Sequence, residues 1–396
     1  MDKEMYDKKV RALLDDPSTY KKLITDPTNS HKNTIIAALA TIKGYIPQTV
    51  YWRLYPNTSQ PPLYFGNPKI HKEGLPMRPI VSARNTIFSG LTKEMGRILS
   101  PLVGHTQHHL RDSTDLKSKL EHVIIPSTHC LISFDLTNMF TNIPSSEAIA
   151  LAGERLHADP KLKERTPIKP DDVIKLLKLD IELAYFRYDG EFYSQPRGLG
   201  MGKSTSSPLS DIFMEDFEQK ALATFPHNDA ILFWLRKADD TLVAVHKDHA
   251  EGLFTHINSI HPDIKWTKEE EEEGAIHMLD VNIKRNTDGS LAFDVFRKPT
   301  HTNQYIHFDS HAPLQHKLAT VRSLTRRAQI IPSTDSAKKE EEKRVHDALA
   351  LNGYPPWAIK QGTFIPKDQR HNGNSSNNSD NNSNNSDNNN RYRKHA

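Results

Sequence analysis

Two apolar segments, each with aspartate at the end of an apolar run, constrain the fold of this chain more than any other feature. The first is HCLISFDL at 129–136, and the second is AILFWLRKADDTLVAVH at 230–246, where Asp239 and Asp240 separate two apolar runs. Short apolar runs of this kind are typical of buried strands. An Asp-Asp pair between two strands is by itself compatible with a simple turn. However, a carboxylate beside a buried strand costs free energy unless it is paired or binds a cation.

Asp135, the aspartate of the first segment, favours the cation over the simple turn. If the two segments are neighbours in one sheet, Asp135 and Asp239 meet at the same edge. Converging carboxylates repel one another, and divalent metal ions relieve that repulsion. Two Mg²⁺ ions about 3.5–4 Å apart are the arrangement that activates a primer hydroxyl and stabilises the leaving pyrophosphate in polymerases. We therefore expect Asp135 and Asp239 to bridge two Mg²⁺ ions, or Mn²⁺ in their place, with Asp240 as a supporting carboxylate.

Phe140, five residues after Asp135, fits the same chemistry. A ring near the sugar of an incoming nucleotide would clash with a 2′-hydroxyl and so favour deoxynucleotides. The same residue is also compatible with an ordinary position in the core.

The segment RGLGMGKST at 197–205 is similar to a phosphate-binding P-loop but does not satisfy its pattern. The pattern requires glycine five residues before Gly202, and Arg197 stands there. The proline in the preceding EFYSQP also argues against a buried strand. We expect these glycines to bring the backbone close to a nucleotide or template strand, ahead of a helix that begins near Ser204. An ATPase would instead require hydrolysis that depends on Lys203.

Composition excludes several classes of protein. The 396 residues include 52 Lys and Arg against 49 Asp and Glu, a net charge of +3, which excludes a histone-like polycation and an acidic disordered chain. Cys130 is the single cysteine, so an internal disulfide and a cysteine-based zinc site are excluded. The charged N-terminus is no signal peptide, and no apolar run is long enough to cross a membrane. We expect an intracellular protein that acts in the nucleus.

The near-neutral total conceals two basic segments. Residues 69–84 hold four basic side chains, Lys69 and Arg78 among them, against Glu73 alone, and such loops suit a triphosphate. Residues 297–327 hold six Lys and Arg against one aspartate, a density that suits a nucleic-acid backbone. The histidines of that segment lack the spacing of a zinc site. The residues expected to contact nucleic acid are Arg297, Lys298, His301, Lys317 and Arg322.

The remaining patterns predict alternating helical and strand-rich regions. Helical spacing covers most of residues 1–55, whereas 60–84 favours loops and short strands. Asp-Gly pairs predict hairpins at 188–195 and around 288–289. Further helices are expected at 89–104, 145–157, 171–185, from about 204 past 218, and from 313 to about 350, with further strands at 264–269, 276–285 and 291–298. Residues 372–390 consist of 11 Asn, 5 Ser, 2 Asp and 1 Gly, which predicts disorder.

Six segments, in this order, resemble the reverse transcriptase of Penelope-like retroelements. They are YFGNPKIHKEGLPMRPIVS, SFDLTNMFTNIP, GLGMGKSTSSPLSDIFMEDFE, ADDTLV, MLDVNIKRNTDGSL and RKPTHTNQYIHFDSHAPLQHK. The resemblance covers roughly residues 1–360.

The resemblance implies an α+β right-hand polymerase fold, related to that of telomerase, with an antiparallel palm sheet and a disordered Asn/Ser-rich C-terminal tail. The implied divisions are an N-terminal helical region at 1–59, fingers at 60–128, a palm at 129–311 with inserted fingers helices at about 145–185, a thumb at 312–360 and the tail at 361–396.

The resemblance also assigns roles to individual residues. Asp135, Asp239 and Asp240 match the catalytic, metal-binding triad. The residues that match nucleotide-binding positions of the family are Lys69, Arg78, Phe140, Met201 and Gly202. The implied partners are an RNA template, a DNA or RNA primer and deoxynucleoside triphosphates.

The chain departs from the family at three places. Lys237 and Ala238 stand where the family usually has Tyr-Val, and Ser207 stands where proline is common. The family also has an Asp-Lys-Gly segment ahead of the region where this chain starts, and many members carry a GIY-YIG endonuclease where this chain has the Asn/Ser tail. We therefore expect no cleavage of target DNA by that route. The functional hypothesis is an RNA-directed DNA polymerase; the alternative is an impaired or co-opted retroelement fragment that binds nucleic acid without polymerising.

Overall fold

The computed structural model describes residues 1–70 and 74–364, which form two compact units. Unit 1 holds Met1–Thr302 and Ile331–Lys338, and unit 2 holds Asn303–Ile330 together with the described residues from Lys339 to Phe364. In the part of the chain that the structure describes, no helix is long and apolar enough to cross a membrane.

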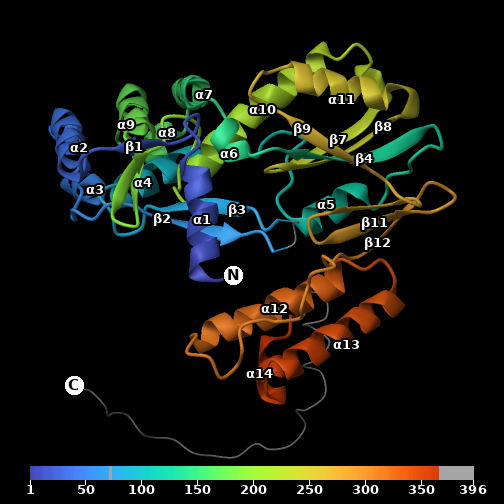
Figure 1. The fold of residues 1–396 in the computed structure, drawn as a ribbon. Helices are drawn as coiled ribbons and strands as arrows, with labels where there is room; N and C mark the ends of the chain where they lie inside the picture. The colour runs from blue at the N-terminus through green and yellow to red at the C-terminus, as the bar shows by residue number, and fades with distance from the viewer. Residues whose placement is uncertain (71–73, 365–396) are drawn as a thin grey trace, which may run out of the picture. The chain divides into compact units, whose positions relative to one another are not determined.

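A four-stranded antiparallel sheet lies toward one end of unit 1, at the right in Figure 1. Its strands follow the order β7-β8-β4-β9 and are β4 His129–Leu136, β7 Ile231–Lys237, β8 Asp240–His246 and β9 Trp266–Glu270. These are the strands that the apolar runs predict, and the two aspartate-ending segments are direct neighbours in the sheet.

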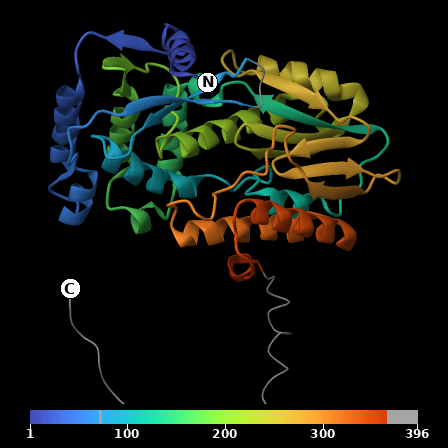
Figure 2. The same cartoon turned by 60° about the horizontal axis from the view of Figure 1, so that its bottom comes forward.

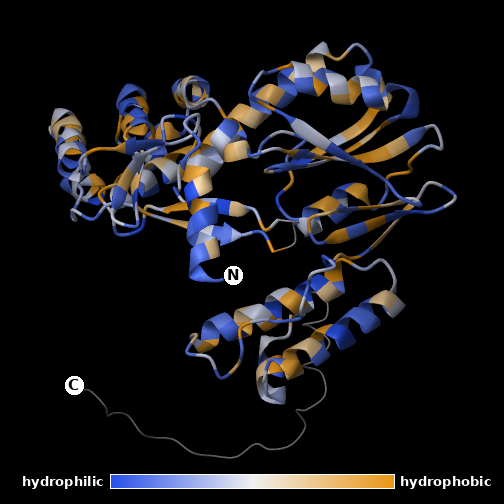
Figure 3. Ribbon diagram, in the orientation of Figure 1, coloured by the Kyte–Doolittle hydropathy of each residue, from blue (hydrophilic) through white to orange (hydrophobic). Residues whose placement is uncertain are grey.

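Both faces of this sheet are covered. On one face, Ile132, Phe134 and Val243 pack into a core shared with α10 Ser206–Thr224 and α11 Ala250–Ser259. On the other face, Leu131 and Leu242 pack into a second core. That second core includes residues of a three-stranded sheet and one helix: α5 Ser113–Leu120, β10 Ala275–Met278, β11 Val281–Arg285 and β12 Leu291–Val295. Figure 2 shows the same layers from a second side, and Figure 3 shows that hydrophobic residues recur along the strands and along the helices that cover them.

A five-stranded sheet and several helices form the rest of unit 1. The sheet has the order β1-β6-β5-β2-β3, and its strands are β1 Lys21–Leu23, β2 Leu63–Pro68, β3 Met77–Ser82, β5 Tyr185–Tyr188 and β6 Glu191–Ser194. Asp189 and Gly190 both have positive φ angles, of 48° and 81°, so the predicted Asp-Gly hairpin is confirmed. The helices are α1 Lys3–Leu14, α2 Thr28–Ile42, α3 Gln48–Leu54, α4 Ser89–Leu99, α6 Met139–Asn142, α7 Ser145–Ala158, α8 Leu162–Arg165 and α9 Pro170–Glu182.

Unit 2 is helical, as predicted for the residues after Pro313. Its helices are α12 Leu314–Ile330, α13 Asp335–Leu351, whose first turn belongs to unit 1, and α14 Pro356–Gly362. Val321, Leu324 and Leu349 are among the residues that form its core.

The structure confirms the α+β class and differs from the sequence predictions in detail. The N-terminal region is not entirely helical, because Lys21–Leu23 pair with β6. The strand predicted at 276–285 is two strands joined at Leu279, which adopts a φ of 55°. The tail is predicted from residue 361, whereas α14 continues to Gly362; the remainder of the predicted disorder, residues 365–396, lies outside the described residues.

Candidate active site

One row of side chains crosses the end of the four-stranded sheet and contains two of the expected aspartates. In Cα register, Lys237 pairs with Asp240, Asp240 with Asp135, and Asp135 with Thr267. Because residues that are paired across strands point to the same face of a sheet, the four side chains lie side by side. The fold therefore makes the two segments neighbours in one sheet, which is the arrangement considered from the sequence.

Asp239 lies beside this row, in the turn that joins β7 to β8. The pairing of Lys237 with Asp240 leaves Ala238 and Asp239 as the two turn residues. Ala238 has a φ of 54°, in the left-handed region that favours glycine. The side chain of Asp239 is exposed, whereas that of Asp240 is half-buried.

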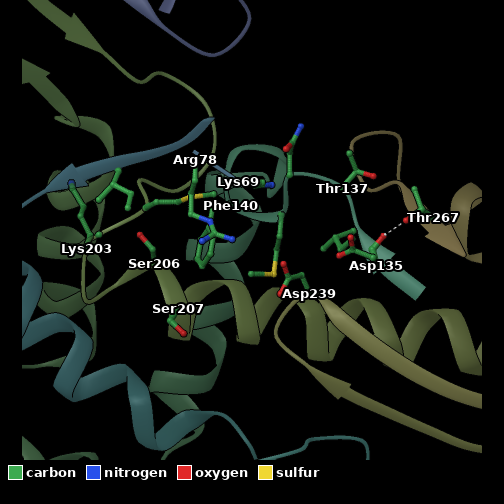
Figure 4. A pocket seen from close by; sticks show the side chains of 16 residues that line it. Lys69, Arg78, Asp135, Thr137, Phe140, Lys203, Ser206, Ser207, Asp239 and Thr267 are labelled. Carbon is green, nitrogen blue, oxygen red and sulfur yellow. Dashed lines mark hydrogen bonds between the residues drawn. The ribbon is translucent and has the colours of Figure 1, made fainter. Parts of the chain in front are cut away.

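Asp135 and Asp239 both line a cavity of about 690 Å³ between the aspartate row and the β2–β3 hairpin. Figure 4 shows the two carboxylates at one end of the cavity, with Arg78, Lys69 and Phe140 further along it. The other lining residues are Ile80, Leu136, Thr137, Asn138, Met139, Met201, Gly202, Lys203, Ser206, Ser207 and Thr267. All five residues that the resemblance assigns to nucleotide binding therefore face one space with two of the three aspartates.

The electrostatics of the aspartates reflect their crowding. Burial, followed by repulsion from Asp239 and Asp135, raises the pKa of Asp240 to about 6. The ammonium of Lys298 opposes this shift, so a residue expected to contact nucleic acid lies within electrostatic range of the aspartates. A raised carboxyl pKa caused by neighbouring carboxylates is a frequent property of functional sites.

The donor set fits a hard divalent cation, although the side chains are not arranged around one. Among the described residues, no group of three or more His, Cys, Asp or Glu has metal-binding geometry. Asp135 and Asp239 nevertheless face one cavity, and a cation there would relieve the carboxylate repulsion that, after burial, raises the pKa of Asp240. Carboxylate oxygens are the ligands that Mg²⁺ takes in proteins. Asp135 and Asp239 would hold the ion or ions, with Asp240 beside them.

The glycines of the 197–203 segment approach the protein's own backbone. A Cβ on Gly202, whose φ is 109°, would lie 2.4 Å from the carbonyl oxygen of Val81, and one on Gly198 would lie 2.5 Å from that of Thr141. The backbone N–H of Val81 donates to the carbonyl of Met201 over 2.8 Å. The sequence predicts that these glycines approach a nucleotide or template strand, whereas the close approaches in the structure are to β3 and α6. The contact with β3 fixes Met201 and Gly202 at the cavity wall.

Lys203 occupies a position that argues against a P-loop. Its side chain is 3% exposed and that of Asp180 is fully buried, with 3.4 Å between Nζ and Oδ1. The ammonium also donates to the backbone carbonyl of Asp180, and Thr205 Oγ1 donates to Asp180 Oδ2 over 2.6 Å. Although the stem of Lys203 reaches the cavity wall, its charge is neutralised inside the protein, away from any phosphate.

The residues expected to contact nucleic acid fall into both units and differ in exposure. In unit 1, Lys298 and His301 are exposed and Arg297 is half-buried. In unit 2, Arg322 is exposed on α12, but Lys317 is buried. The Lys317 ammonium donates to the carbonyl of Ser310 over 2.8 Å and lies over the ring of Phe308. Charge density alone had no means of distinguishing this internal lysine from a surface one.

Several residues of the site carry no signal in the sequence. Thr267 joins the row only through the register of β9 against β4, and its hydroxyl donates to the carbonyl of Asp135 over 3.3 Å. Ile80 and Asn138 reach the cavity through the β2–β3 hairpin and a left-handed turn, respectively. Arg236 on β7, just ahead of the aspartate turn, does carry a signal in the sequence, because a cation inside an apolar strand requires a buried partner.

Comparison with solved structures shows which folds this chain is similar to. The structure is similar to telomerase from Candida albicans in complex with a fragment of telomeric RNA, with a TM-score of 0.52 and 10% identity over 88% of this chain and 63% of that one. Telomerase from Candida tropicalis, also with telomeric RNA, matches with a TM-score of 0.48 and 11% identity over 81% of this chain and 56% of that one. The BmCPV RNA-dependent RNA polymerase matches with a TM-score of 0.48 and 10% identity over 88% of this chain and 31% of that one.

The match to the Candida albicans telomerase defines the class of fold. At 10% identity the Candida albicans match shows that the chain has a nucleic-acid polymerase fold of the kind found in telomerase, and the chain spans 63% of the telomerase chain that it matches. Residues 304–363, most of which belong to unit 2, match the family described as an animal helix-turn-helix domain. No curated protein sequence matches the chain.

Proposed function

We propose that this chain is an RNA-directed DNA polymerase of the Penelope-like kind, which extends a primer 3′ end with deoxynucleoside triphosphates by two-metal-ion catalysis. The observation that carries the proposal is the joint lining of one cavity by Asp135 and Asp239 at one end and by Lys69, Arg78 and Phe140 further along. The polymerase fold supports it independently.

Each lining group has a role in this reaction. Bound Mg²⁺ would activate the primer hydroxyl and stabilise the charge that develops on the leaving pyrophosphate. Asp135 and Asp239 would hold the metal, while Lys69 and Arg78 would bind the triphosphate oxygens. Phe140 would pack against the sugar, and Met201 and Gly202, fixed against β3, would form the wall of the nucleotide pocket.

The proposed partners follow from the same surfaces. Lys298 and His301 are exposed in unit 1, and Lys298 lies within electrostatic range of Asp240. Both side chains would contact the primer backbone. Arg322 and Arg326 are exposed on α12 within the helix-turn-helix match, and an RNA template paired with a DNA or RNA primer is the partner that suits them.

Primer extension tests the reaction. Purified protein with an RNA template, a DNA primer and Mg²⁺ should incorporate deoxynucleotides, and Asp239→Asn should reduce the rate roughly 1,000-fold, since a catalytic metal contributes several kcal/mol. Asp248→Asn is the matched control, because Asp248 is exposed at the opposite end of β8. If Asp239→Asn extends primers at the wild-type rate, the assignment is wrong.

Nucleotide selection tests the kind of polymerase. Phe140→Ala should let ribonucleotides be incorporated with an efficiency at least about tenfold higher relative to deoxynucleotides, since one steric contact changes discrimination by about 1–3 kcal/mol. If the wild-type protein prefers ribonucleotides, it is an RNA polymerase, and the proposal that it synthesises DNA is wrong.

The second candidate function is a nucleic-acid-binding protein without polymerase activity. Lys237 and Ala238, in place of the Tyr-Val common in the family, favour it, because Lys237 occupies the end of the aspartate row. Binding of a primer–template duplex in a filter assay, without Mg²⁺-dependent extension at any pH, would select this candidate.

A further inference from the structure

A buried ionic network lies behind the turn that carries Asp239. The side chain of Arg236 on β7 is 1% exposed, and it points to the face of the sheet that packs against α10. Lys237 and Asp240 belong to the opposite face, so Arg236 and the aspartate row lie on two sides of one sheet. The connection between the two sides is the turn itself.

The α10 helix supplies the acidic half of this network. Asp211, Glu215 and Glu218 are four and three residues apart, a spacing that places them on one face of a helix. Arg236 Nε donates to Glu218 Oε1 over 2.7 Å, and Nη1 donates to Asp211 Oδ1 over 3.1 Å. Glu218 Oε1 also accepts from Trp234 Nε1 over 2.9 Å, so the helix holds two side chains of β7.

The same guanidinium reaches the turn. Arg236 Nη1 donates to the backbone carbonyl of Ala238 over 3.1 Å. Ala238 is the residue with the left-handed φ of 54°, a conformation that persists only where surrounding contacts impose it. The backbone of Arg236 is also held on the outer side of the edge strand β7. Its N–H donates to the carbonyl of His108 and its carbonyl accepts from the N–H of Leu110, over 2.8 Å each. The guanidinium is thus a rigid link between α10 and the peptide that precedes Asp239.

We infer that Arg236 is a positioning residue for Asp239, and that α10, through Glu218 and Asp211, sets where that carboxylate stands relative to Asp135. The inference rests on the proposed function and deepens it. It assigns to the polymerase site a support on the reverse face of the sheet, in addition to the residues that line the cavity. Arg236 touches neither the cavity nor a reacting atom in this assignment.

Removal of the link should reduce turnover more than it weakens nucleotide binding. In Arg236→Met, Asp239 loses its fixed position, and a misplacement of about 1 Å costs about 100-fold in kcat. The KM for deoxynucleotide should stay within about threefold, because Lys69 and Arg78 are unchanged. Arg236→Lys keeps the charge but offers one ammonium where a forked guanidinium serves three acceptors, so it should recover only part of the rate.

The matched control uses the neighbouring ion pair of the same helix face. Arg155 Nη1 donates to Glu215 Oε2 over 2.5 Å and to the carbonyl of Leu102 over 3.0 Å, and neither bond involves the turn. Arg155→Met should lower thermal stability as Arg236→Met does, yet leave kcat within about threefold of wild type. Asp211→Asn is a milder variant, because Asp211 is 19% exposed and its loss leaves the Glu218 pair in place.

Metal binding separates this inference from the proposed function. Mn²⁺ titration followed by electron paramagnetic resonance should show at least about tenfold weaker binding in Arg236→Met and no change in Arg155→Met. If the wild type binds Mn²⁺ in this way but never extends a primer, the proposed function fails while the positioning role stands. Wild-type kcat and wild-type Mn²⁺ affinity in a folded Arg236→Met would overturn the inference. If Arg236→Met does not fold, the same two measurements on Arg236→Lys and Asp211→Asn decide it.

Discussion

Two groups of three carboxylates lie close together in this protein and behave in opposite ways. The front carboxylates are Asp135, Asp239 and Asp240, and the rear carboxylates are Asp211, Glu215 and Glu218. Each rear carboxylate meets an arginine, since Arg236 binds two of them and Arg155 binds the third. In the front group, by contrast, burial and then repulsion from Asp239 and Asp135 raise the pKa of Asp240 to about 6.

The difference shows how charge can be used for structure or kept for chemistry. A buried carboxylate with a hydrogen-bonded arginine is a neutral, directional link between two elements. Carboxylates that repel one another destabilise the fold until a cation arrives, and this makes them suitable metal ligands. The turn at Ala238 joins the two groups, because Arg236 holds its carbonyl from behind and Asp239 projects in front.

The largest expected change in stability comes from a substitution among the rear carboxylates. Glu218→Gln leaves the Arg236 guanidinium, 1% exposed, with part of its charge uncompensated, and this should lower the free energy of unfolding by about 3 kcal/mol. Urea denaturation at pH 7 measures the loss. Glu215→Gln should cost less, because its partner Arg155 is 28% exposed and water can solvate it. If the Glu218→Gln protein is as stable as wild type, the rear carboxylates do not have the structural role assigned to them.

A substitution among the front carboxylates should raise the free energy of unfolding instead of lowering it. The folded-state pKa of Asp240 is about 6, above the ordinary value of 3.8, so ionised Asp240 destabilises the fold above pH 6. Asp240→Asn should therefore raise the free energy of unfolding at pH 7, without metal, by roughly 2 kcal/mol after allowance for solvent screening. The gain should disappear as pH falls from about 6 to below 4. Urea denaturation at pH 4, 6 and 8 in EDTA would show it, and an unchanged gain at pH 4 would contradict the raised pKa of Asp240.

Magnesium should stabilise the protein through the front group alone. At a Mg²⁺ concentration ten times its dissociation constant, binding adds about 1.4 kcal/mol, a rise of a few degrees in Tm. Asp239→Asn should abolish the rise in Tm. Glu215→Gln should have a lower Tm without Mg²⁺ but show the same rise when Mg²⁺ is added. Thermal unfolding with MgCl₂ and with EDTA is the measurement, and an equal rise in Asp239→Asn would place the ion elsewhere.

The smallest effect concerns the turn between the groups. Ala238 adopts a φ of 54°, which costs a non-glycine residue about 1 kcal/mol, while glycine loses part of that gain through its freer unfolded chain. Ala238→Gly should therefore raise stability by about 0.5 kcal/mol in chemical denaturation. A loss of stability instead would mean that the left-handed turn is not the conformation in solution.

Much of the architecture could be predicted from local sequence patterns. The apolar runs at 129–136 and 230–246 predict strands, and the Asp-Gly pairs predict hairpins, because periodicity and turn preference act within a few residues. The location of the site follows from the same segments, since both end in aspartate. Lys317 shows the limit of such patterns: a basic residue in a basic segment is nevertheless buried, with its ammonium bound to Ser310.

The sequence by itself determined the strands, the turn and the chemical character of the front carboxylates. Only the tertiary structure decided that Asp240 pairs with Asp135, that Thr267 completes the row, and that Arg236 meets Glu218 from another element. The physical reason is that strand and turn preferences arise from neighbouring residues, whereas register and buried ion pairs depend on segments that meet only when the chain has folded.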